Sequence, residues 1–347
     1  MISTQPIFSI KYFQFRKNRI PKDIKCLFYL SWEDSLWDIL NKKNIKKGSM
    51  VLVPDFYCGD VEANIIKHGY RIAHYKINSN LNADLNSFVY SISKYIPEVI
   101  IIFHPVGIKS NLLDRPNWLI KITGNSILIE DAVHRALDAK DFSIIKKNHF
   151  IVDSLRKVVP IQGSRVYGRG KDLNFNVPGI FQSFNYSLKV NFLWFLMTLA
   201  WTLNFQKIAE KLMIKGYSLI GDSVLPARGS TLARFFSERL NITAIQNIKR
   251  RQVNYYEDNL KNIIYKKLKI SDKDKKHLRG HPLILPIGRA NKILKCLRNN
   301  GFLIRFELND SAWSKKQKVI YLPLGVCMSN KQQIKVCRII RLCLSKI

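Results

Sequence analysis

Short apolar runs alternate with helix-like stretches through the first half of the chain. Residues 50–53 are apolar throughout and stop at Pro54, which predicts a buried strand. A helical pattern follows from about 61 to 68, and Gly69 stands where a left-handed C-terminal cap is expected. Strands that are apolar on both faces and separated by helices predict a mostly parallel sheet covered on each side. The further strands expected in this half are 71–75, 99–103, 126–130 and 149–152.

The pattern changes in the second half. Residues 163–172 are rich in Gly and Arg and are predicted to form a loop, whereas helices are expected to dominate from about 190 to 260. Ser329, with Gln332 three residues later, is typical of the capping box that begins a helix. The other elements expected near the C-terminus are strands over 281–287, 302–308 and 319–322 and a helix over 290–299.

These elements predict an α/β fold with two parts. The first, residues 1–245, is expected to be a large three-layer domain built on a mostly parallel sheet, and the second, residues 246–347, a smaller C-terminal α/β domain.

Residues 191–205 form the most apolar stretch of the chain, flanked by Lys189 and Lys207. A helix that spans a membrane needs about 20 apolar residues. This run has 15 and contains two asparagines. A buried helix is therefore the favoured interpretation, and peripheral contact with a membrane or a partner subunit is the alternative.

The net charge of the chain bears on the kinds of molecule that it can bind. The chain has 57 Lys and Arg against 25 Asp and Glu, a net charge of +32. Such a surface attracts polyanions, nucleotide-linked substrates or anionic lipid headgroups. A general preference for Lys, Ile and Asn, visible at 41–47, explains the excess more simply, and no nucleic-acid-binding motif accompanies it. A nucleic-acid partner is therefore not expected.

The six cysteines are scattered without CxxC spacing, which argues against a zinc site and against a disulfide framework. No apolar stretch of signal-peptide length follows the basic residues near the N-terminus. Both features predict a cytoplasmic location and no bound metal.

Two candidate catalytic residues lie at or just beyond the ends of the expected strands. Asp131 ends the apolar run 126–131, and Lys157 follows 26 positions later. Because ligands bind beyond the carboxyl ends of parallel strands, both side chains are expected at one edge of the sheet. A lysine amine that forms a Schiff base and a carboxylate that pairs with a pyridinium nitrogen are what pyridoxal phosphate requires of its protein.

The segments around both residues resemble the DegT/StrS-type pyridoxal-phosphate-dependent sugar aminotransferases. In that family a Pro-aromatic loop, a His-x-x-Gly segment, a Glu-Asp-Ala-x-His segment and a lysine segment follow in order. One branch writes the last as Ser-Leu-Arg-Lys-x-x-Pro, which residues 154–160 spell. The corresponding segments here are 54–58, 104–107 and 130–134, with weaker matches at 249–255 and 321–324. The resemblance runs from about residue 27 to the C-terminus and implies an aspartate-aminotransferase-like large domain.

The resemblance also implies the roles of individual residues. Lys157 would bond to the cofactor, Asp131 would pair with its ring nitrogen, and His134 would lie near its 3-hydroxyl group. Ser154 would contribute to the phosphate site. An aromatic residue after the proline usually stacks on the ring, and the candidates are Phe56 and Tyr57, of which Tyr57 is counted among the site residues.

One segment departs from the family. The usual Ser-Gly-Thr turn, whose helix N-terminus grips the phosphate, is replaced by Ser31-Trp32-Glu33-Asp34. Ser31 remains a candidate phosphate donor. A carboxylate beside a phosphate costs roughly a kcal/mol or more at a few ångströms and a surface-like dielectric.

Two functions follow from these features. The first is an aminotransferase that moves an amino group from an amino-acid donor to a keto-sugar, expected to be nucleotide-linked, in surface-glycan biosynthesis. The resemblance also implies a homodimer, because members of that family are dimers. The second is a catalytically altered or inactive member of the same fold that acts as a binding subunit.

Overall fold

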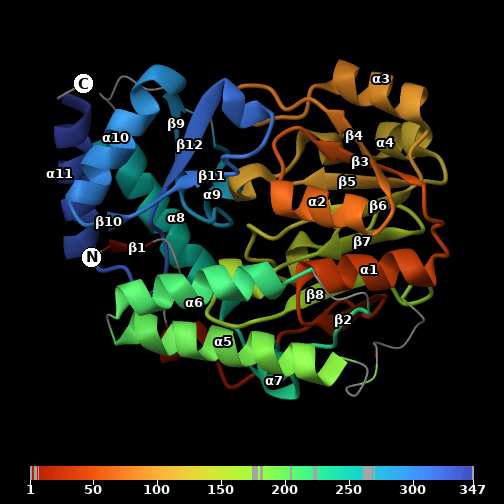
Figure 1. Ribbon diagram of the computed structural model, residues 1–347, viewed down its shortest axis with the longest axis horizontal. Coiled ribbons are helices and arrows are strands. Elements are labelled where there is room, and N and C mark those ends of the chain that lie inside the picture. The colour runs from red at the N-terminus through yellow and green to blue at the C-terminus, as the bar shows by residue number, and fades with distance from the viewer. Residues whose placement is uncertain are drawn as a thin grey trace.

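A seven-stranded sheet forms the larger part of the molecule (Figure 1). The computed structural model describes the whole chain except residues 1, 4, 5, 7, 174–178, 180–182, 204, 222–224, 261–267, 269, 346 and 347. Within that part, the strand order of the large sheet is β2-β8-β7-β6-β5-β3-β4. Its strands are β2 (Ile24–Tyr29), β3 (Met50–Pro54), β4 (Arg71–Tyr75), β5 (Val99–Phe103), β6 (Ile127–Asp131), β7 (His149–Val152) and β8 (Ser164–Arg169).

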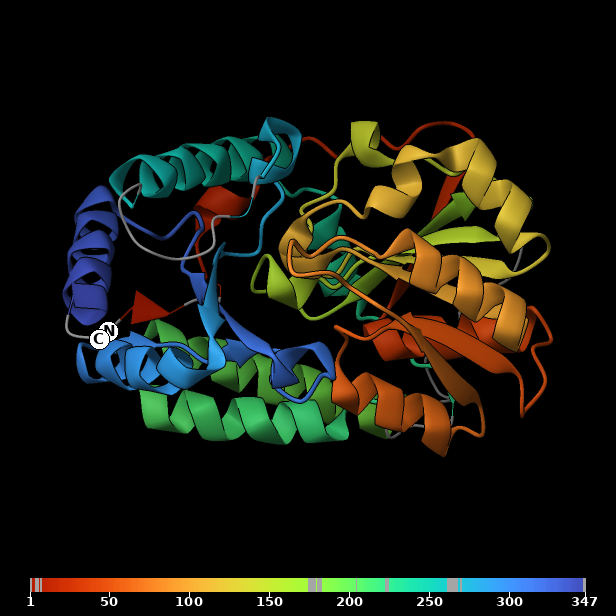
Figure 2. The ribbon, with the colours of Figure 1, turned by 90° about the horizontal axis from the view of Figure 1, so that it is seen from above.

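The large sheet is mostly parallel, as the sequence predicts. Neighbouring strands from β4 through β7 run parallel, and β8 runs antiparallel to both β7 and β2. Every residue of β3, β5, β6 and β7 is buried, so both faces of these strands are covered. The helices of this half are α1 (Trp32–Lys42), α2 (Gly59–Lys67), α3 (Leu85–Tyr95) and α4 (Pro116–Thr123) (Figures 1 and 2).

The prediction of a loop over 163–172 is wrong, because most of this segment forms β8. Its backbone pairs with β2 on one side and β7 on the other. Burial of Arg165 is compensated by Asp153, whose carboxylate accepts from the arginine Nε at 2.8 Å and lies 2.6 Å from Nη2. Neither the pairing strands nor the ion pair can be read from the local composition.

Helices dominate the next segment and a second sheet follows. The helices are α5 (Phe184–Thr202), α6 (Gln206–Leu219), α7 (Thr231–Ser237), α8 (Ile242–Asn259) and the short α9 (Asp272–Lys275). The smaller sheet is antiparallel, in the order β11 (Phe306–Glu307), β12 (Gln317–Leu322), β9 (His281–Pro286). It packs with α10 (Ile287–Asn299) and α11 (Asn330–Ser345) around a separate apolar cluster. No helix in the described part of the chain has the length and apolarity needed to cross a membrane.

Three details refine the predicted C-terminal region. The capping box is present, since the Ser329 and Gln332 side chains each bond to the other's backbone N–H. The segment expected as one strand over 302–308 is interrupted, giving β10 (Phe302–Leu303) and β11, and β10 pairs in parallel with β1 (Ile2–Ser3). The chain's first residues therefore join the part predicted to begin at residue 246, and that boundary stays a prediction.

One pair of cysteines is bonded. The cysteine spacing argues against a disulfide framework, yet Cys296 of α10 and Cys343 of α11 form a disulfide. The two residues are 47 positions apart, and only the packing of α10 against α11 brings their Cα atoms to 5.7 Å.

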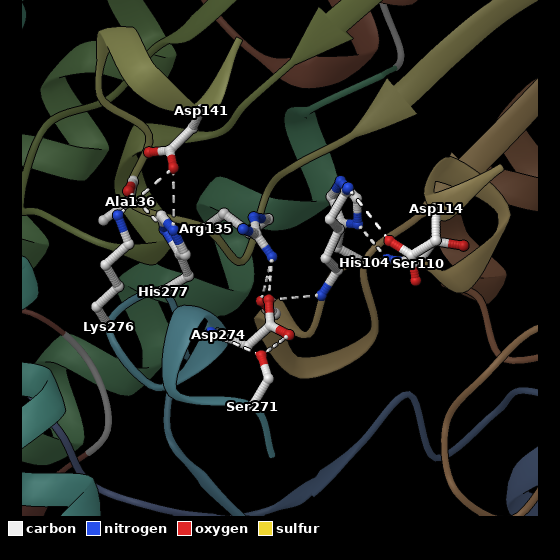
Figure 3. Close-up of polar contacts among 12 residues, drawn as sticks. His104, Ser110, Asp114, Arg135, Ala136, Asp141, Ser271, Asp274, Lys276 and His277 are labelled. Atoms are coloured by element: carbon white, nitrogen blue, oxygen red, sulfur yellow. Dashed lines mark hydrogen bonds and ion pairs between the residues drawn. The ribbon is translucent and has the colours of Figure 1, made fainter. Parts of the chain in front are cut away.

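A polar network attaches the start of the smaller part to the loops of the large sheet (Figure 3). Arg135, in the loop after β6, lies 3.0 Å from the Asp274 carboxylate of α9. His277 lies 3.2 Å from the Asp141 carboxylate, and its Nδ1 is 2.9 Å from the Ala136 carbonyl oxygen. These contacts hold the loop that carries His134 against the segment 271–279.

Replacing Asp274 with asparagine is expected to lower the free energy of unfolding by about 2 kcal/mol, because it leaves Arg135 buried without its charge partner. Burial opposes ionisation, but Arg135 and the Ser271 hydroxyl lower the pKa of Asp274. The stabilisation is therefore complete above the ordinary carboxyl pKa and is lost as pH falls through the lowered value. Urea unfolding at several pH values measures both effects.

Asp272→Asn is the matched control on the same helix, because Asp272 is exposed and pairs only with the side chain of Lys275 in the described contacts. Its unfolding midpoint should stay near that of the wild type. Equal effects of the two substitutions would contradict the proposed role of the network.

Candidate functional site

A cavity of about 840 Å³ opens at the carboxyl ends of β6 and β7. Helices α1, α2 and α6 and the strand β11 also contribute to its wall. Of the six site residues predicted from the sequence, five line this cavity, and Ser31 does not. The five are Tyr57, Asp131, His134, Ser154 and Lys157.

Asp131 is the last residue of β6 and is held in one orientation. Its Oδ2 accepts a hydrogen bond from the Tyr57 hydroxyl at 2.7 Å, and its Oδ1 accepts from the Val133 N–H at 3.1 Å. Burial raises the pKa of Asp131 to about 7. Tyr57 is itself buried and meets Trp32 and Phe103 edge to face. In this arrangement Tyr57 is a partner of the Asp131 carboxylate, whereas the sequence predicts that it stacks on the cofactor ring.

His134 is held by two residues that the sequence analysis missed. Its Nε2 lies 3.4 Å from Glu307 of β11 and 3.2 Å from Nη1 of Arg279. The Arg279 guanidinium donates to both Glu307 oxygens, at 2.9 and 3.1 Å. Burial lowers the pKa of His134 to about 4, so the imidazole is neutral at pH 7. No residue in the described part of the chain bonds to its Nδ1.

Lys157 ends a short 3-10 turn, Leu155–Lys157, just after β7. Its Nζ lies 3.5 Å from the hydroxyl of Tyr217, a residue of α6 that sequence reasoning did not single out. Burial lowers the pKa of the Lys157 amine, and Arg279 and Arg156 lower it further. Burial alone would raise the pKa of Tyr217, but Lys157 and neighbouring arginines lower it to about 7.

The N-terminal turn of α1 differs from its expected role. Ser31 is the N-cap of α1: its hydroxyl donates to the Asp34 Oδ2 at 2.6 Å and accepts from the Asp34 N–H at 3.1 Å. The Asp34 Oδ1 accepts from the Ala227 N–H at 2.9 Å. Both side chains are buried in the turn itself, so Ser31 is not among the residues around the cavity. The capping bonds use the hydroxyl that the prediction assigned to the phosphate.

Three residues of the cavity wall have unpartnered donors instead. Trp32 Nε1, Ser154 Oγ and two nitrogens of Arg156, Nε and Nη1, are buried and have no hydrogen-bond partner among the described residues. All three residues line the cavity. Buried donors without a partner are costly, and a phosphate group would satisfy several of them at once. The residues present therefore fit a phosphorylated cofactor, although one carboxylate, that of Glu33, has an unpartnered oxygen there too.

The fold is shared with solved aminotransferases. A Streptococcus pneumoniae protein named as a sugar aminotransferase superimposes with a TM-score of 0.61 over 99% of this chain and 94% of its own, at 14% identity. A Brucella abortus DegT DnrJ EryC1 StrS aminotransferase gives a TM-score of 0.61 over 92% of this chain and 86% of its own, at 15% identity. A Clostridium acetobutylicum histidinol-phosphate aminotransferase gives 0.60 over 94% and 85%, at 12% identity.

No protein-family model matches the sequence, and no curated protein matches it. At these identities the likeness shows the fold, an α/β architecture with a mostly parallel central sheet, over nearly the whole chain.

The Tyr217 phenol is expected to titrate near pH 7, because the adjacent cations favour its phenolate form. Burial raises the pKa of other core tyrosines such as Tyr29 and Tyr75, so this step should stand alone. Phenolate absorbance of the cofactor-free protein between about pH 5 and pH 9 measures it.

Tyr217→Phe should remove the step, and Lys157→Met should move it to higher pH. Lys211→Met, which removes an exposed lysine of the same helix, is the control and should leave the step in place. If the midpoint of the phenolate titration were the same in Lys157→Met as in the wild type, the side chains of Lys157 and Tyr217 would not be coupled.

Proposed function

We propose that this protein is a pyridoxal-phosphate-dependent aminotransferase that transfers an amino group from an amino acid to a keto-sugar. One observation carries the proposal: a lysine with a lowered pKa and a buried aspartate meet in one cavity that unpartnered donors also line. The shared fold with sugar aminotransferases supports it.

The residues around the cavity match the needs of the cofactor. When bound, pyridoxal phosphate supplies an aldehyde that bonds to amines and a ring that withdraws electrons from the substrate carbon. Lys157 is suited to bond to that aldehyde and to carry a proton at Nζ, because its lowered pKa leaves more of the amine neutral near pH 7. Asp131 would hold a proton at the ring nitrogen, and the Tyr57 hydroxyl orients its carboxylate.

The phosphate would bind to the donors of Trp32, Ser154 and Arg156. The Arg156 guanidinium lies over the rings of Trp194 and Tyr217, 5.5 and 4.9 Å from their centroids, which fixes its plane. A neutral His134 beside the ring, held by Glu307 and Arg279, would serve as a hydrogen-bonding group with no charge of its own.

The cavity has room and charge for a larger substrate. Its volume of about 840 Å³ is within the range of small-molecule sites. Arg298 and Arg305 lie on its wall and are exposed, so their guanidinium groups are available to an anionic ligand. These arginines support a diphosphate-linked sugar as the acceptor, which fits a role in surface-glycan biosynthesis.

The second candidate is an inactive member of the fold that serves as a binding subunit. Glu33 favours it, because its carboxylate lies at the cavity and opposes a phosphate. Asp34 does not favour it, since its carboxylate is bonded to Ser31 and Ala227. Direct measurement of cofactor attachment separates the two.

Borohydride reduction of the protein with pyridoxal phosphate is expected to attach the cofactor to Lys157, and Lys157→Ala should abolish the attachment. The lowered pKa of its amine is the reason. Peptide mass spectrometry locates the label, and transfer of the amino group from an amino-acid donor to the cofactor should disappear in the same variant.

Lys249→Met is the matched control. Lys249 is a second buried lysine, and burial lowers its pKa to about 7, but it is not part of the cavity wall. This variant should be labelled like the wild type. Attachment to Lys249 would contradict the assignment of Lys157, and a wild-type protein that takes up no cofactor would favour the binding subunit.

Opposite effects on cofactor affinity are expected at Arg156 and Glu33. Arg156→Gln should weaken binding about tenfold, because a charged donor to the phosphate is lost. Glu33→Gln should tighten binding about fivefold, since it removes the repulsion between the Glu33 carboxylate and the phosphate, which is roughly 1 kcal/mol. Fluorescence titration with pyridoxal phosphate measures both.

Pyridoxal, which lacks the phosphate, is the control ligand. Its affinity should not fall in Arg156→Gln or rise in Glu33→Gln as the affinity for pyridoxal phosphate does. If both ligands respond equally, these residues contact the ring or shape the cavity, and the phosphate assignment is wrong.

A further inference from the structure

The hairpin of α5 and α6 has an exposed apolar face. The two helices lie side by side along the outside of the molecule (Figures 1 and 2). Trp194, Met197 and Trp201 of α5 are buried against α6. The opposite side of α5 has a row of large apolar side chains at intervals of three or four residues, each 43% to 63% exposed, which we call the α5 stripe. It consists of Phe184, Leu188, Phe192, Phe195, Leu199 and Leu203.

The α5 stripe is uninterrupted by charge over its central part. Between Lys189 and Thr202 the exposed residues are Phe192, Phe195 and Leu199, while the polar Asn191 and Thr198 are only half-buried, so three turns of helix present mainly apolar side chains to solvent and no charge. An ordinary surface helix has polar residues on its outer face. Scattered exposed apolar residues are normal, but a continuous row of this size marks a binding surface. The prediction that 191–205 is a buried helix is therefore only half right.

The hairpin that carries the stripe is basic. Lys207, Lys211 and Lys215 follow one another at intervals of four along the exposed side of α6, and Lys189 lies on α5. Glu210 is the one acidic residue of the described chain between 184 and 220. Lysine side chains extend several ångströms from the backbone and can reach past the edge of an apolar contact.

We propose that the α5–α6 hairpin lies in the surface of an anionic phospholipid bilayer. The α5 stripe would enter the acyl boundary and the lysines would meet the headgroups, the arrangement of an interfacial amphipathic segment. Charge complementarity argues for this occupant, because the chain carries a net charge of +32 and the exposed lysines of the same hairpin attract anionic headgroups.

This placement is independent of the catalytic proposal. Met213, Ile214 and Tyr217 of α6 belong to the cavity wall, so the hairpin that meets the bilayer also borders the cavity. The membrane contact needs only the outer faces of the two helices, and it stands whether or not the cavity turns over a substrate.

Vesicle flotation with the full-length protein tests the proposal. The protein should bind vesicles of phosphatidylcholine with phosphatidylglycerol and bind pure phosphatidylcholine much more weakly. Phe192→Ser with Phe195→Ser should reduce the partition coefficient about tenfold or more, because two large apolar groups no longer enter the lipid. The matched control, Val89→Ser with Tyr90→Ser, changes exposed apolar residues of α3 at the opposite edge of Figure 1 and should bind like the wild type.

The contribution of charge is tested separately. Lys211→Glu with Lys215→Glu should also weaken binding about tenfold or more, while Lys121→Glu on α4 should not. Circular dichroism checks that every variant is folded. Absence of binding to the anionic vesicles, or binding unaffected by the stripe variant, would overturn the proposal. So would a stripe variant that converts a dimer to a monomer in light scattering without any vesicle binding, because a second copy would then cover the face.

Discussion

The parallel pairing of β5, β6 and β7 is the constraint on which the rest of the site depends. Phe103 pairs with Asp131, and Asp131 pairs with Val152, so the three strands end side by side. Each chain segment that leaves this edge then begins within reach of the others. Lys157, five residues beyond Val152, reaches the same cavity as Asp131 for that reason.

The second requirement is compensation of buried charge. Arg279 and Glu307 arrive from the smaller part of the molecule and pair with each other beside His134. Either charge alone in this position would cost several kcal/mol, so the smaller part and the loop that carries His134 stabilise each other. The cavity itself is less fully compensated: the Arg156 nitrogens and a Glu33 oxygen have no bonding partner in the described structure. Groups left in this state are typical of places where a ligand completes the network.

Sequence patterning anticipated much of the large sheet, because apolar strands flanked by helices are a local signal. It failed at β8, where Arg165 is buried only because Asp153 neutralises it. It also failed at α5, whose composition suggests a core helix although one side of it faces solvent. In both cases a local rule was overridden by what lies next to the segment, which composition does not reveal.

For the site, the sequence alone determined the chemical identities and the strand ends of Asp131 and Lys157, because a residue's type and its place after an apolar run are local properties. It also determined which segments are candidates for the phosphate. Only the tertiary structure decided that Ser31 caps α1 while Trp32 and Arg156 line the cavity, since capping depends on the geometry of the turn. The tertiary structure alone brought Tyr217 to Lys157, which is 60 positions earlier in the chain (217 − 157). It also brought Glu307 to His134, which is 173 positions earlier (307 − 134). Contacts over such separations are set by how helices and sheets pack, a property of the whole chain and not of any segment.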